Sequence, residues 1–348
     1  TEPDPYSGLA DKELLAKNIP DLKLYHPAAI TAEQALDYAK QCESAALNYD
    51  KRITNSEGGS FSTHEQYYVY GNSDGFLAAY PSSRYSVSCS VIGQVGDSMQ
   101  RDYDYAVARD FNDLLDLTQI GTNAAAKTIA RLGARKIATC KAPVLLEPKM
   151  ASSFWHTLLA AISGGNLYRK SSFLLDCLHK DILPKFINIK EYPHLPKGLS
   201  SAPFDHEGVA TQEKNIITDG VFSTYLLSSY SARRLGLQTT GNAGGAHNCT
   251  LTPGTPDQAQ LIKQMHTGLI VTELLGSGVN LVTGDYSQGA AGFWVENGSL
   301  QYPVEEITIV GNLRDMYANL VAVGNDLDHR YSVITGSVLL EAMTIAGN

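Results

Sequence analysis

The sequence KAPVLLEPKMASSFWHTLLAAISGGNLYRKSSFLLD, residues 141–176, decides the fold of this chain. Residues 141–147 are an apolar run with the length and composition of a buried strand. Residues 150–162 are strongly apolar over the length of a helix, and Gly164-Gly165 closes them. A buried strand that leads directly into a buried helix predicts the opening of a domain with a sizeable core.

Upstream of this segment, between about residues 51 and 111, apolar residues recur at every second position. Such alternation is typical of long antiparallel strands with one buried and one wet face. A helix with a capping box at Thr31 and Gln34 precedes them, and a second helix over 117–132 follows. The alternation is carried by Tyr85, Val87, Cys89, Val91, Tyr103, Tyr105 and Val107, with serines at 86, 88 and 90.

Downstream, Asp219-Gly220 and Asn297-Gly298 each separate two short apolar runs, which predicts two tight β-hairpins, and a helix is expected near 257–266. The whole pattern predicts an α+β fold with large antiparallel sheets and packed helices. We divide the chain into an extended lead-in at 1–30, the remainder of an N-terminal α+β domain at 31–137 and a C-terminal strand-rich domain at 138–348.

Composition narrows the class of protein. Apolar residues make up 43% and charged residues 18% of the 348 residues, as in ordinary soluble proteins. The net charge is −9, and no basic run exceeds Arg233-Arg234, so we expect no nucleic-acid partner. An apolar stretch of about 18 residues, as a membrane span requires, does not occur. Five dispersed cysteines without CxxC spacing predict reduced thiols and a cytoplasmic location.

The nine histidines do not show the spacing of zinc-peptidase ligands, because no two of them lie within five residues of each other. Cys177 and His179 would point apart on a helix. The sequence contains neither a phosphate-binding loop nor a GxSxG elbow. A Ser-His-acid triad needs no fixed spacing and stays open. We interpret the polar triplet 205–207 (DHE), which follows Pro203, as a solvated turn.

Five motifs, in order along the chain, closely resemble the PmbA/TldE proteins, paralogues of TldD in one metallopeptidase family with the historical label of DNA gyrase modulators. The resemblance runs from Asp4 to Asn348. It implies that roughly the first hundred residues of the family's length are missing before Thr1. The motifs are residues 152–176 (SSFWHTLLAAISGGNLYRKSSFLLD), 198–205 (GLSSAPFD), 229–247 (SYSARRLGLQTTGNAGGAH), 284–304 (GDYSQGAAGFWVENGSLQYPV) and 309–312 (IVGN).

The resemblance also implies that the zinc site is degenerate. TldD-type members carry HExxxH on the helix after the buried strand, and a cysteine near the carboxy terminus completes the site. The alignment places His156 at the first histidine, Thr157 at the glutamate and Ala161 at the second histidine. The cysteine region falls at 334–337 (ITGS), which holds no cysteine. We therefore expect no metal and no catalytic residue in this chain, and a hydrogen-bonded core or interface role for His156.

A non-catalytic subunit implies a partner. The family pattern suggests a heterodimer with a zinc-bearing TldD-type subunit, or a homodimer in isolation, acting on unfolded peptides such as peptide-antibiotic precursors or an antitoxin. Alternatives are an independent hydrolase with an unrecognised site and a gyrase or nucleic-acid modulator. Candidate peptide-contacting residues surround the glycine-rich loop 239–247, where glycine exposes the backbone. They are Arg233, Arg234, Asn242, Gly244, Gly245 and His247.

Overall fold

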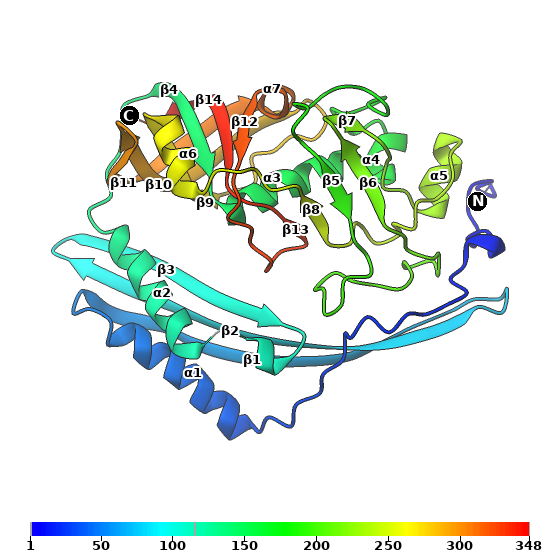
Figure 1. Cartoon of the computed structure of the whole chain (residues 1–348), viewed down its shortest axis with the longest axis horizontal. Helices are drawn as coiled ribbons and strands as arrows, with labels where there is room; N and C mark the ends of the chain where they lie inside the picture. The colour runs from blue at the N-terminus through cyan, green and yellow to red at the C-terminus, as the bar shows by residue number, and fades with distance from the viewer. Residues whose placement is uncertain (1, 115, 348) are drawn as a thin grey trace.

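The computed structural model describes residues 2–114 and 116–347. Thr1, where the expected lead-in begins, and Asn348, where the expected C-terminal domain ends, lie outside the described residues. Figure 1 shows a long curved sheet with two helices on its outer face, and a larger strand-rich part of the chain across its inner face. The α+β class with antiparallel sheets and packed helices is confirmed. None of the helices among the described residues has the length and hydropathy needed to cross a bilayer.

The long sheet is antiparallel with the strand order β1-β2-β3. Its helix-facing side buries Val87, Cys89 and Val91, as the alternation predicts, because α1 and α2 pack there. The elements are α1 (Ala32–Leu47), β1 (Ile53–Gly71), β2 (Leu77–Val95), β3 (Ser98–Ala108) and α2 (Leu117–Ala130), with a 3-10 turn at Phe111–Asp113. The capping box of Thr31 and Gln34 is present at α1.

The face expected for Tyr103, Tyr105 and Val107 was wrong, although the period of two was right. Tyr105 pairs with Ser88 and Tyr103 pairs with Ser90, so these side chains share the polar face of the serines. Ala106 and Ala108 are buried instead. The pairing register with β2 decides which face of β3 is covered, and the alternation within β3 does not contain that register.

The strand-rich part contains two sheets with α3 between them (Figure 1). Their strand orders are β11-β10-β9-β4-β14-β12 and β13-β8-β5-β6-β7, with parallel pairing only at β4–β9 and β13–β8 among the described strands. The strands are β4 (Cys140–Leu146), β5 (Ile189–Glu191), β6 (Lys214–Thr218), β7 (Val221–Phe222), β8 (Cys249–Leu251), β9 (Gly268–Leu275), β10 (Asp285–Glu296), β11 (Ser299–Asn312), β12 (Leu320–Val323), β13 (Val333–Ile334) and β14 (Val338–Ala346).

Both expected hairpins are confirmed. Asp219 and Gly220 connect β6 to β7, and Asn297 and Gly298 connect β10 to β11, all four with positive φ angles. The helices of this part are α3 (Pro148–Ala161), α4 (Gly164–Tyr168), α5 (Ser229–Leu235), α6 (Gln258–Met265) and α7 (Leu313–Ala318).

Helix α3 forms the centre of the largest core. Its Trp155 is fully buried, and the rings of Phe154 and Tyr317 stack at a centroid distance of 4.3 Å. The hydroxyl of Tyr317 donates to the carbonyl of Phe154 at 2.6 Å. A helix that is apolar over most of its circumference is stable where protein covers it on several sides, and here only a narrow strip of α3 faces solvent.

Candidate functional site

The solvent-facing strip of α3 carries His156. Its side chain is exposed, which rules out the core half of the expected core or interface role, because Phe154, Trp155 and Leu158 take up the buried side of the helix. An interface role stays a prediction. Residues five apart on an α-helix are separated by about 140° around its axis. Ala161 accordingly lies on the buried side, fully enclosed.

His156 opens onto a groove of about 290 Å³ between α3, α4 and the glycine-rich loop. Gly244 and Gly245 of that loop line the same groove, as does Asn242. The φ angle of Gly245 is +118°, and a Cβ atom built there would meet nothing within 4 Å. Gly245 therefore presents bare backbone to open space, beside the one imidazole of α3.

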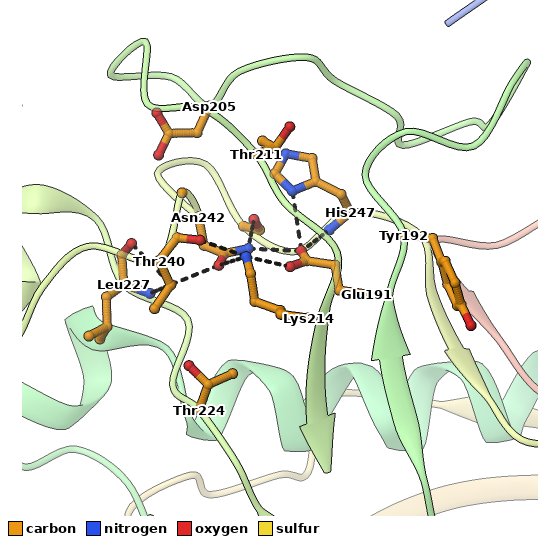
Figure 2. A network of polar contacts seen from close by, with 12 residues as sticks. Glu191, Tyr192, Asp205, Thr211, Lys214, Thr224, Leu227, Thr240, Asn242 and His247 are labelled. Atoms are coloured by element: carbon orange, nitrogen blue, oxygen red, sulfur yellow. Dashed lines mark hydrogen bonds and ion pairs between the residues drawn. The ribbon is translucent and has the colours of Figure 1, made fainter. Parts of the chain in front are cut away.

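A buried charged network holds the glycine-rich loop in place, as Figure 2 shows. Glu191, the last residue of β5, is fully buried. Its Oε1 accepts from the backbone N–H of His247 at 2.6 Å and from the Asn242 side-chain amide at 2.8 Å. Its Oε2 lies 2.8 Å from Nζ of Lys214, which also donates to the side-chain oxygen of Asn242 at 2.9 Å.

The electrostatics of this network favour the charged form of Glu191. Burial alone would raise the pKa of Glu191, but hydrogen bonding to His247 and the charge of Lys214 lower it overall. Asn242 and His247 therefore direct polar groups at Glu191 and hold the loop from within. Any contact of theirs with a peptide stays a prediction.

Asp205 anchors the other side of the loop, and its burial corrects the solvated turn expected at 205–207, of which His206 is exposed. Asp205 is fully buried, and its two oxygens accept from the backbone N–H groups of Glu207, Val209 and Ala243 at 2.9 to 3.0 Å. Burial raises the pKa of this carboxyl, although the three backbone donors act in the opposite direction. Pro203 and the short polar run gave no sign that tertiary packing covers this turn.

Arg233 and Arg234 of α5 contact the lead-in and do not line the groove. Arg233 donates to the carbonyl of Leu9 at 2.5 Å and forms an ion pair with Asp11 at 3.0 Å. The guanidinium carbon of Arg234 lies 5.0 Å from the centre of the Tyr6 ring. The structure thus separates these two arginines from Asn242, Gly244 and Gly245, which line the groove, whereas His247 is buried against Glu191 on the same loop and does not line it.

Comparison with known proteins places this architecture in a family. Residues 25–132 match the PmbA/TldA metallopeptidase central domain, and residues 139–347 match its C-terminal domain. The chain belongs to the PmbA/TldD metallopeptidase family. It is 53% identical over 347 residues to the metalloprotease PmbA of Escherichia coli O157:H7, an alignment that covers 100% of this chain and 77% of that protein.

Solved structures of similar proteins agree with the PmbA/TldD assignment. A candidate modulator of DNA gyrase from Bacteroides thetaiotaomicron superposes with a TM-score of 0.93 at 31% identity, over 99% of this chain and 79% of that chain. TldE of Thermococcus kodakarensis superposes with a TM-score of 0.81 over 100% of this chain and 81% of its own. At 21% identity, the TldE likeness shows the fold alone.

The donors present on α3 do not fit the zinc that this metallopeptidase family implies. Thr157, which the resemblance aligns with the family's glutamate, donates to the carbonyl of Ser153 at 3.1 Å, and Ala161 offers no metal-binding atom. Strand β13 packs beside α3, and the buried Thr335 and Ser337 follow it without a thiol. Within 2–114 and 116–347, no three His, Cys, Asp or Glu side chains are grouped to hold a metal ion.

Sequence reasoning missed Glu191 and Lys214, which hold the groove-lining loop. They stand on neighbouring strands, 23 positions apart in the chain, and their pairing depends on the register of β5 with β6. Strand β5 is only Ile189-Lys190-Glu191, with two adjacent charged residues, and nothing in it marks Glu191 as the buried one. Charged residues are almost never fully buried unless they are paired, and the partner of Glu191 appears only when β5 and β6 are placed side by side.

Restoring the second histidine tests whether α3 still has room for a metal ligand. Ala161→His should lower the free energy of unfolding by about 1–3 kcal/mol, because the larger side chain enters a filled core. Thr157→Glu on the half-exposed strip should change it by less than about 0.5 kcal/mol. Urea unfolding followed by tryptophan fluorescence measures both. Equal stability of the two variants would show that the core around Ala161 can open.

Proposed function

We propose that this chain is the non-catalytic subunit of a TldD/TldE-type zinc metallopeptidase that processes or degrades unfolded peptides. In this proposal a TldD-type partner supplies the zinc, and a homodimer forms when the partner is absent. The family's associated substrates, peptide-antibiotic precursors and an antitoxin, are the candidates for its own. All five cysteines are unpaired, which supports a reducing cytoplasmic location.

One observation carries the proposal: α3 offers a single imidazole where a hydrolytic zinc needs three protein ligands and an open position. His156 faces the groove, Ala161 faces the core, and neither Thr157 nor the segment 334–337 replaces the missing donors. The scaffold is kept, because the core around Trp155 and the loop anchored by Glu191 are both intact.

The groove supports a part for this subunit in peptide binding. Glycine backbone at Gly244 and Gly245 leaves N–H and C=O groups accessible to an extended chain. His156 can donate to, or accept from, a peptide backbone that lies along the groove. Main-chain recognition of this kind is independent of peptide sequence, as a subunit that admits unfolded substrates requires.

Peptidase assays of the separated and combined subunits test the proposal. We expect the purified chain to leave an unfolded peptide intact, with or without added zinc. Addition of a TldD-type partner should produce cleavage, which a chelator abolishes. His156→Ala should leave the zinc content of the combined subunits unchanged, because the imidazole binds no metal, and should raise KM by up to about tenfold, the loss of one hydrogen bond to the peptide backbone.

Two outcomes would overturn the proposal. Chelator-sensitive cleavage by the purified chain would show that it builds its own active centre. Equal activity of the partner with and without this chain would show that it is not a functional subunit. Co-elution of the two chains in size-exclusion chromatography is the control that they meet in the assay.

A further inference from the structure

A second and larger cavity, of about 520 Å³, lies away from the groove, between the long sheet and the strand-rich part of the chain. Strand β3 and helix α2 form one wall, and the start of α3 and the loop 326–331 contribute to the others; Figure 1 shows these elements facing one another. The rings of Tyr103, Tyr105, Phe293 and Tyr331 line it. The proposed peptidase role does not use this cavity.

Most of the charge in the cavity is already neutralised within the protein. Three of its four cationic side chains form ion pairs with carboxylates, and the fourth, Lys149, donates to the hydroxyl of Tyr103 at 2.5 Å. The pairs are Lys127–Asp104 at 2.8 Å, Arg330–Asp104 at 3.1 Å, Arg330–Asp328 at 2.6 Å, Arg131–Asp102 at 3.4 Å and Arg131–Glu273 at 2.7 Å. The three ion-paired cations are therefore committed to carboxylates, whereas Lys149 lies against the hydroxyl and ring of Tyr103.

Two carboxylates of the cavity lack an ion pair within the described part of the chain. Asp326 accepts from the backbone N–H and the hydroxyl of Ser337 instead, and Glu147 is the other. It occupies the N-cap position of α3, and no Lys, Arg or His nitrogen of the described residues lies within 4 Å of its carboxylate. Burial raises its pKa; the opposing influences are the charge of Lys127, itself paired with Asp104, and the neutral amide of Gln258. Glu147 is half-buried, and withdrawal of a carboxylate from water without a counter-ion is costly, so a bound cation would lower that cost.

A second group in the cavity also lacks a partner. The phenolic oxygen of Tyr331 is buried and makes no hydrogen bond of ordinary geometry among the described atoms, although burial and then the nearby Tyr105 hydroxyl raise its pKa. An ammonium group has three N–H donors and no acceptor, so it can satisfy a carboxylate and a phenolic oxygen together. The faces of aromatic rings attract the same cation.

We propose that this cavity binds a primary ammonium group, with Glu147 as its counter-ion, Tyr331 as a second acceptor and aromatic rings around it. The ammonium can come from the amino terminus of a peptide or from a lysine side chain. A guanidinium fits this cavity less well than an ammonium, because its planar set of N–H donors pairs best with two parallel acceptor atoms. The inference is independent of the proposed subunit role and concerns a different part of the molecule.

Single-residue probes test the site, because they lack the extended backbone that the groove would bind. Isothermal titration of the full chain would compare phenylalaninamide, which carries an α-ammonium, with Nα-acetyl-lysinamide, which carries a side-chain ammonium. Nα-acetyl-phenylalaninamide is the neutral control. We expect saturable binding of at least one ammonium probe and none of the control; which probe binds more tightly identifies the source.

Variants assign the binding to the cavity. Glu147→Gln should weaken binding by about thirtyfold or more, the loss typical of one partner of a buried charge pair. Tyr331→Phe should weaken it by about tenfold, as for one hydrogen bond to a charged group. Glu306→Gln removes an exposed carboxylate that pairs with Lys136 outside the cavity and should leave binding unchanged. Thermal unfolding shows whether each variant is folded.

Three results would overturn the inference. They are no binding of either ammonium probe, equal binding of the neutral control, and wild-type affinity in a folded Glu147→Gln variant. If Glu147→Gln did not fold, wild-type affinity in a folded Tyr331→Phe variant would overturn the inference instead.

Discussion

Replacement of Glu191 by alanine should lower the free energy of unfolding by about 3–5 kcal/mol, the cost of removing one partner of a buried ion pair. The variant leaves Lys214 largely buried without a counter-ion and withdraws the acceptor of the Asn242 and His247 hydrogen bonds. Urea unfolding at neutral pH measures the loss. Glu213→Ala is the matched control, because Glu213 pairs with Lys190 at the surface and should contribute about 0–1 kcal/mol.

The effect should depend on pH in a defined direction. Because the pKa of Glu191 is lowered in the folded state, its stabilising contribution is present above the ordinary value of 4.5 and is lost as the pH falls through the folded value. The difference in unfolding free energy between wild type and Glu191→Ala should therefore shrink in acid. A constant difference from pH 7 to pH 3 would contradict the charged pairing of Glu191 with Lys214.

Gly245→Ala should weaken the binding of a labelled unfolded peptide by about tenfold, or 1.4 kcal/mol. The added methyl group projects into open space that the peptide backbone would occupy, and a φ angle of +118° is unfavourable for alanine. Fluorescence anisotropy with a sequence-scrambled set of peptides measures the affinity and its independence of sequence. The same loss should appear for every peptide in the set.

Gly58 provides the control for backbone strain. Its φ angle is +115°, a Cβ atom there would also meet nothing within 4 Å, and it lies on β1 in the long sheet, outside the groove. Gly58→Ala should lose a similar amount of stability, on the order of 1–3 kcal/mol, without loss of peptide affinity. If Gly245→Ala and Gly58→Ala bound the peptide with equal affinity, the groove would not be the peptide-binding site.

Local chemistry explains which parts of the fold were predictable. The hairpins at Asp219-Gly220 and Asn297-Gly298 were found because two-residue loops require positive φ angles, and those residue types supply them. The capping box at Thr31 was found because both of its bonds join residues three apart. The apolar run of α3 was long enough to be identified as a helix without knowledge of its neighbours.

Contacts between segments that are distant in the sequence explain why the other features of the fold and the site could not be predicted. The covered face of β3 depends on its register with β2, so Tyr105 could not be placed from its own alternation. Asp205 looked like a surface turn because its burial depends on the loop that holds Ala243. His156 lies on the uncovered strip of α3, and only the packing of both sheets shows where that strip is. The groove itself joins segments 86 residues apart, from 156 to 242.

Zinc content of the isolated chain, measured by inductively coupled plasma mass spectrometry after dialysis against zinc, is the decisive measurement. The donor set on α3 predicts far less than one zinc ion per chain, with the same residual value for wild type and His156→Ala. Close to one tightly held zinc per chain, lost in His156→Ala, would contradict the conclusion that this scaffold has kept its fold without its metal site.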